Sequence, residues 1–195
     1  MRGVAGGPVA PARALAVASV LLLVTACLDH GGDPLRGPTD PNLSALGVPV
    51  GEKVTWGAAV LVNEGSEPVE LESVSLVGAM IDPQVARVEE ISVHEAGPRI
   101  GLIGIVNGLG YETVPADRRS PVEGAKVEPQ SQPGSGVAVL VTVKALQNGT
   151  WRADGLVVTY RVDGATRTMR TPSGFAVCVH PEGAFCDIDL AEATG

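Results

Sequence analysis

The residues best spaced for chemistry lie near the C-terminus, in the segment Cys178-Val-His-Pro-Glu-Gly-Ala-Phe-Cys186. The Pro, Glu and Gly between the cysteines favour a turn, so the two thiols could close a hairpin disulfide in an oxidising compartment. Alternatively, Cys178, His180 and Cys186 could bind a metal ion, although three ligands at this spacing do not match the common zinc motifs. We predict the disulfide between Cys178 and Cys186, and we keep His180 as a candidate metal ligand.

Nucleophilic catalysis needs a nucleophile, a base and a group that orients the base. The sequence has neither a Gly-x-Ser-x-Gly elbow nor a Ser-x-x-Lys motif. His94 lies beside Glu95 and just ahead of Gly97-Pro98, a pattern typical of a solvated histidine at the end of a strand. We therefore predict no catalytic residue and no cofactor, and His94 joins His180 as a candidate ligand for copper or zinc.

Residues 107–135 form the longest irregular stretch after the N-terminal region, with four Pro and an adjacent Arg118-Arg119 pair. At most one short strand is expected there, near Val122–Val127. Loops held by a rigid scaffold often carry the residues that bind a partner. The sequence therefore predicts either a binding loop that uses Tyr111, Arg118 and Arg119 or simply a mobile surface loop.

The first 27 residues predict an export signal. Arg2 and Arg13 precede or open an acid-free apolar run, Ala14–Thr25, which has the length of a signal peptide and is too short to span a bilayer. The run ends in Val24-Thr25-Ala26-Cys27, which resembles the bacterial lipobox, an aliphatic residue and two small ones before a cysteine. The resemblance implies cleavage before Cys27 and a diacylglyceryl thioether on its sulfur, with acyl chains such as palmitate. An ordinary secretory signal is the alternative.

The sequence divides into an expected signal peptide (1–26), a lipidated, disordered tether (27–50) and a folded domain (51–195). Residues 28–50 contain four Pro, four Gly and three Asp and show no helical or strand periodicity. A flexible tether of that length has an r.m.s. reach of about 25 Å. Cleavage removes two of the 14 basic residues and none of the 22 acidic ones, so the mature net charge is 12 − 22 = −10. That charge disfavours binding to nucleic acid and to anionic lipid.

From Lys53 onward, short Val- and Leu-rich runs alternate with turn residues. In Val137–Lys144 every odd position is valine, and the even positions change from apolar residues to Thr and Lys, so one face is expected in the core and the strand is expected to emerge into solvent at its end. Asp163-Gly164 predicts a two-residue type I′ hairpin. The other predicted strands are Val54–Val62, Val69–Val77, Val85–Val93, Ile100–Val106, Leu156–Val162, Ala165–Arg170 and Phe175–Val179. We predict an all-β fold, an antiparallel immunoglobulin- or fibronectin-like sandwich of seven or eight strands, with an open barrel as the alternative.

Two segments carry a resemblance to known proteins. Val60–Leu71 resembles the strand, Asn-x-Gly turn, strand unit of many bacterial immunoglobulin-like lipoproteins. Gly149–Arg161 is similar to uncharacterised secreted proteins of high-GC Gram-positive bacteria. The resemblance implies an actinobacterial secreted lipoprotein with a β-sandwich domain, and it implies no activity.

These features favour a non-catalytic lipoprotein, a binding or structural module held on the outer face of the cytoplasmic membrane. The expected partners are the membrane, through the lipid on Cys27, and an envelope protein; nucleic acid is not expected. Two alternatives stay open. One is an extracytoplasmic copper or zinc carrier that uses His94 and His180, and the other is an accessory subunit of an envelope enzyme whose site lies in residues 107–135.

Overall fold

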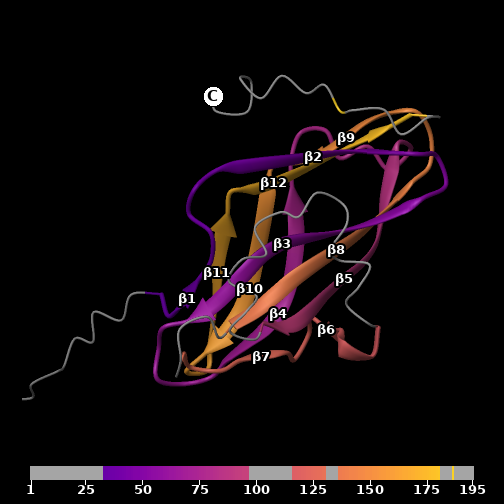
Figure 1. The fold of residues 1–195 in the computed structure, drawn as a ribbon. Coiled ribbons are helices and arrows are strands. Elements are labelled where there is room, and N and C mark those ends of the chain that lie inside the picture. Colours follow the sequence, from indigo (N-terminus) through magenta and orange to yellow (C-terminus); the bar gives the residue numbers. More distant parts are fainter. Residues whose placement is uncertain (1–32, 97–115, 131–135, 181–185, 187–195) are drawn as a thin grey trace, which may run out of the picture. The chain divides into compact units, whose positions relative to one another are not determined.

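Twelve β-strands and the 3₁₀ turn Ala116–Arg118 make up the part of the chain that the structure describes, residues 33–96, 116–130, 136–180 and 186 (Figure 1). The structure is a computed structural model, and these residues all belong to the compact unit Gly32–Gly195. Within them there is no helix of the length and apolarity needed to cross a membrane. The predicted all-β, immunoglobulin-like sandwich is confirmed, but the predicted strand number is wrong.

The first layer is a five-stranded sheet in which every neighbouring pair is antiparallel. β8 lies at its centre and is the strand whose valine pattern is clearest. In spatial order the sheet contains β1 (Leu35–Arg36), β3 (Lys53–Asn63), β8 (Gly136–Ala145), β5 (Ala86–Ala96) and β6 (Ser120–Pro121).

The second layer contains a four-stranded antiparallel sheet, in the order β11 (Ala165–Thr171), β10 (Gly155–Val162), β4 (Val69–Val77) and β7 (Lys126–Val127). β10 and β11 form the predicted hairpin: Val162 pairs with Ala165, and the two residues between them have φ angles of 52° and 73°. Positive φ at both central positions is the type I′ geometry, which Asp-Gly adopts at low cost. The hairpin prediction is therefore confirmed.

A three-stranded sheet continues the second layer beyond a corner, in the order β2 (Asn42–Val48), β12 (Ser173–Val179) and β9 (Gly149–Ala153). The chain turns this corner twice, at Asp154 between β9 and β10 and at Pro172 between β11 and β12. A Cβ atom at Gly155 would collide with the main-chain oxygen of Thr171, so only glycine lets the two strands approach so closely here.

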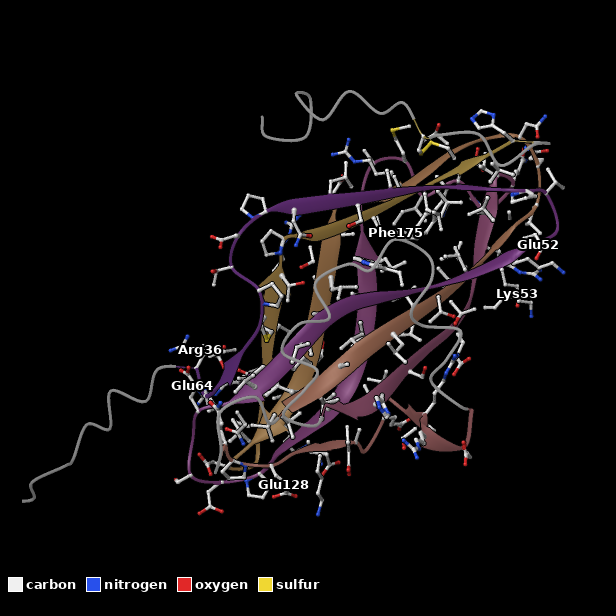
Figure 2. The ribbon with its side chains drawn as sticks, viewed as in Figure 1. Arg36, Glu52, Lys53, Glu64, Glu128 and Phe175 are labelled. Carbon is white, nitrogen blue, oxygen red and sulfur yellow. A yellow bond between two sulfur atoms is a disulfide. The ribbon has the colours of Figure 1, made fainter. Side chains whose placement is uncertain are left out.

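Valine and leucine fill most of the core, and four large rings anchor it: Trp56, Trp151, Tyr160 and Phe175, all buried. The rings of Trp56 and Phe175 stack with centroids 5.0 Å apart and planes 14° apart. This contact joins β3 of the first layer to β12 of the three-stranded sheet (Figure 2 labels Phe175). Offset-stacked rings add stabilisation beyond the area they bury.

β8 emerges into solvent only near its end, at Lys144, as predicted. Its valines face the core, also as predicted, and the opposite face is buried too, since Ala138, Leu140 and Thr142 are 3%, 0% and 8% exposed. The reason is the central position of β8 in its sheet, where side chains of β3 and β5 flank it on both sides; Thr55 of β3, for example, hydrogen-bonds Thr142 at 3.0 Å.

The prediction of a disordered tether over residues 27–50 is wrong for two segments, and so is the predicted start of the domain at residue 51. β1 pairs with β3, and Arg36 of β1 forms an ion pair at 3.0 Å with Glu64, the residue that follows β3 (Figure 2). β2 pairs along its whole length with β12, and this pairing is parallel. A parallel partner 131 residues away leaves no local signal in the sequence, which is why Pro and Gly content misled the prediction.

The remaining strand predictions divide in three. Those for β3, β4, β5, β8, β10, β11 and β12 are confirmed, with bounds that shift by three residues at most. β9 was not foreseen, and the short strand expected near Val122–Val127 is two separate two-residue strands, β6 and β7. The predicted strand Ile100–Val106 lies outside the described residues.

Candidate functional site

The structure brings together two candidate residues, His94 and Arg118, that no signal in the sequence connects. β6 pairs with Ser92–Val93 of β5, and this pairing carries the preceding 3₁₀ turn onto the β5 strand. As a result, Nδ1 of His94 lies 2.9 Å from the main-chain oxygen of Arg118. His94 was predicted as a candidate metal ligand, and Arg118 as part of a binding loop.

This hydrogen bond fixes the orientation and the tautomer of the His94 ring. A main-chain oxygen can only accept a hydrogen bond, so Nδ1 must carry the hydrogen in both ionisation states. In the neutral ring, Nε2 then keeps its lone pair, and in the charged ring Nε2 becomes a second donor. The ring is half-buried, so it offers Nε2 to a bound molecule from a fixed position.

Two arginines, Arg118 and Arg119, stand in the chain at the point where the His94 ring contacts the main chain. Arg118 is exposed, and its side chain forms no ion pair with any described residue. The side chain of Arg119 is only 15% exposed and forms an ion pair with Glu90, at 3.7 Å. We call His94, Arg118 and Arg119 the β5–β6 patch.

The donor set of the β5–β6 patch suits recognition of an anion. Arginine presents forked N–H donors that match carboxylate and phosphate groups, and charged hydrogen bonds are about twice as strong as neutral ones. Ser92 lies two residues before His94 on β5, but its buried hydroxyl has no hydrogen-bond partner in the described part of the chain. His94 and Ser92 therefore do not form the nucleophile–base contact that catalysis would need.

The other predicted candidates lie elsewhere. Cys178 and Cys186 form the predicted disulfide, with Cα atoms 5.3 Å apart, so the disulfide prediction is confirmed. The alternative metal site with His180 is wrong because both sulfur atoms are bonded to each other. His180 is exposed just beyond the end of β12, where its main-chain N–H donates to the oxygen of Val48.

Metal ligands do not gather in the part of the chain described here: it holds no group of three or more His, Cys, Asp or Glu side chains placed to share an ion. His94 and His180 belong to different sheets. Tyr111, the third residue of the predicted binding loop, lies outside the described residues.

A second polar cluster, on the outer face of the four-stranded sheet, was not foreseen. Arg161 of β10 contacts Glu72 at 2.7 Å and Glu70 at 4.0 Å, and Thr166 of β11 donates to Glu72 at 3.3 Å. The hydrogen bond to Glu72, with the charges of both carboxylates, raises the pKa of Arg161. The sequence predicts one part of this cluster, because the Asp-Gly turn sets Arg161 opposite Thr166. It contains no signal for the pairing of β10 with β4, which brings in Glu70 and Glu72.

Comparison with known proteins adds distant structural likenesses only. No protein-family model matches the chain, and no curated protein does. Among solved structures, the VesB protease of Vibrio cholerae is 9% identical with a TM-score of 0.35, over 75% of this chain and 32% of that one, so this chain spans about a third of its length. PapD-like domain 7 of human CEP192 is 11% identical with a TM-score of 0.37, over 83% and 96%. The CooA pilin subunit of enterotoxigenic Escherichia coli is 13% identical with a TM-score of 0.34, over 76% and 100%.

Proposed function

We propose that this chain is a non-catalytic, lipid-anchored module of the cell envelope that binds an anionic partner through the β5–β6 patch. The observation that carries the proposal is the hydrogen bond between His94 and the main chain at Arg118. It holds the imidazole against the main chain of the Arg118-Arg119 segment, on a chain whose net charge is −8. Local positive charge on an acidic protein directs an anion to one place on the surface.

The place of display rests on the N-terminal sequence. An apolar run of signal-peptide length ends in Val24-Thr25-Ala26-Cys27, which resembles a lipobox. A thioether-linked lipid on Cys27 would hold the domain on the outer face of the cytoplasmic membrane, since two acyl chains anchor a protein stably where one does not. The resemblance to immunoglobulin-like lipoproteins of actinobacteria agrees with this location.

The partner is best identified by crosslinking the full chain in its own cells and recovering it with whatever it has bound. Arg118→Glu should reduce recovery of the partner by about tenfold or more, because a charged hydrogen bond is worth about 1.5 to 3 kcal/mol. Arg87→Glu is the matched control: it makes the same charge change at an exposed residue of β5, far along that strand from His94.

Three outcomes would contradict the proposal. Equal recovery with both variants would show that the β5–β6 patch is not the binding site. Turnover of an envelope substrate that Arg118→Glu abolishes would show that the module is catalytic. Finally, Cys27→Ser should prevent incorporation of labelled fatty acid, and unchanged labelling would remove the lipid anchor from the proposal.

A further inference from the structure

Among the described residues β11 is an edge strand, and one side of its backbone has no strand partner there. It lies at the end of the four-stranded sheet and pairs only with β10. In a two-residue hairpin the residues that flank the turn form a hydrogen-bonded pair, and such pairs alternate along the strands. Counting from Ala165, the N–H and C=O groups of Thr166, Thr168 and Arg170 therefore point away from β10.

Nothing in the described part of the chain occupies that edge. The hydrogen bonds outside regular strands include none to the main chain of these three residues. The connection between β1 and β2 does come close to β11 at Gly37, but it meets the side chains of Met169 and Thr171. Those residues alternate with the edge residues, so they project from the inner face of the strand.

The strand also lacks the devices by which proteins usually protect an edge. It has no proline from Ala165 to Thr171, and its register with β10 runs without a bulge. Natural edges are commonly blunted by proline, bulges or very short strands. Only the arginines of β11 resist pairing, and they resist only partners that would place a positive charge opposite them.

We propose that a second copy of this chain pairs with β11, antiparallel and in register about a two-fold axis at Thr168, so that two four-stranded sheets become one sheet of eight strands. Thr168 then lies opposite Thr168 of the partner subunit, and Thr166 lies opposite Arg170 of the partner subunit. The N–H and C=O groups of all three edge residues point away from β10, so each of the three residue pairs across the axis exchanges two hydrogen bonds. This register therefore makes six main-chain hydrogen bonds. The interface is isologous, as expected of a closed dimer.

Charge favours a second copy over another extended strand. In one copy, the ion pairs of Glu70 and Glu72 with described residues are both made to Arg161, and Glu72 also accepts from Thr166, while Lys126 of β7 lies opposite Glu70. Arg170 is exposed, and it forms no ion pair with a described residue. Since Arg170 of the partner subunit would lie opposite Thr166, its guanidinium would reach Glu72 and give that carboxylate a second cation. An acidic strand would instead bring a third carboxylate to this point.

The register is tested by cysteine crosslinking of the full chain in its own cells. Thr168→Cys places two thiols across the two-fold axis, with Cα atoms about 5.5 Å apart, within disulfide range. Ser73→Cys is the matched control, because Ser73 is also exposed and lies in the same cross-strand row, two strands from Thr168. In the dimer two Ser73 residues are about 24 Å apart, five strand spacings, and cannot be bridged.

The expected result is an oxidant-dependent adduct of twice the chain mass with Thr168→Cys and none with Ser73→Cys. Adding Arg170→Glu should weaken the dimer about 2- to 25-fold, since a surface ion pair is worth a factor of about 1.4 to 5 and occurs twice. Arg118→Glu, the same charge change in the β5–β6 patch, should leave the adduct unchanged, so failure of the dimer and failure of the proposed function are distinguishable. Equal crosslinking by the two cysteine variants, an adduct with another protein, or no effect of Arg170→Glu would each overturn the proposal.

Discussion

Asn63 at the end of β3 offers the sharpest test of how the sandwich is held together. Its side chain is fully buried and makes three hydrogen bonds to main-chain groups. Nδ2 donates to the oxygen of Glu67 at 2.8 Å and to the oxygen of Val127 at 2.9 Å, and Oδ1 accepts from the N–H of Gly65 at 2.9 Å. One amide thus closes the β3–β4 turn and fixes β7 against it.

Asn63→Ala would leave these three groups without partners. The oxygen of Val127 is buried, and an unsatisfied buried acceptor costs about 1 to 3 kcal/mol; the two partly buried groups add about 1 kcal/mol each. We therefore expect the free energy of unfolding to fall by about 3 to 5 kcal/mol. Ser66→Ala is the control within the same turn, and because Ser66 is exposed it should change stability by less than about 0.5 kcal/mol.

The assay is urea unfolding of both variants, with the midpoint and the slope followed together. Asn63→Asp refines it: the new carboxylate would face the oxygens of Glu67 and Val127, which raises its pKa above the ordinary value of about 4. A raised folded-state pKa means stability that is present in acid and lost as pH rises through that pKa. A loss below about 1 kcal/mol for Asn63→Ala, or a pH-independent Asn63→Asp, would refute the role assigned to this amide.

Three further perturbations have defined outcomes. Reducing the Cys178–Cys186 disulfide, which closes a loop of sequence separation 8, should cost about 2 to 3 kcal/mol, and the oxidised denatured chain should show no reactive thiol at either position. The hydrogen bond from Lys53, ahead of its charge, lowers the pKa of Glu89 from 4.5, so this group stabilises the fold above that pH and the benefit is lost as pH falls through the lowered pKa. Lys53→Ala should therefore flatten the acid limb of a stability-versus-pH curve, and an unchanged limb would argue against the ion pair. Gly155→Ala should cost about 2 to 3 kcal/mol because the added methyl group meets the backbone at the sheet corner; thermal unfolding with an unchanged midpoint would show that the corner can relax.

The sequence predicts those parts of the fold that depend on local signals, such as turn residues and the residues that bound a strand. Val69–Val77 is bounded by a Pro-containing turn and by Gly78, and β4 has those same bounds. The Asp163-Gly164 turn sets the β10–β11 register because the type I′ geometry permits only one closing pair. In both cases the information needed to place the strand lies within a few residues of it.

β2 shows what local signals miss. Its sequence, Asn42–Val48, contains a glycine and follows a proline-rich stretch, so on composition it belongs to a tether. It becomes a strand because β12 offers a row of main-chain partners from Ser173 to Val179. Parallel pairing between opposite ends of a chain depends on the completed fold, and no periodicity within β2 encodes it.

The candidate site divides along the same line. Arg118 and Arg119 were predicted as binding residues from their place in an irregular stretch, and His94 from its residue type alone. The contact between His94 and Arg118 depends on β6, a two-residue strand that contains Pro121 and would not be recognised as a strand by propensity. Residue types therefore indicate which side chains could bind a ligand, whereas a short non-local strand pairing decides that His94 and Arg118 come into contact.

The early start of the domain also changes what the proposed anchor can do. If Cys27 carries the lipid, the chain from Cys27 to the first strand at Leu35 is eight residues long, and even fully extended it spans less than about 29 Å. A domain of this size is roughly 40 Å across. If the β5–β6 patch binds a partner, that partner must therefore come within about 70 Å of the lipid surface, which favours membrane-proximal anions over distant layers of the envelope.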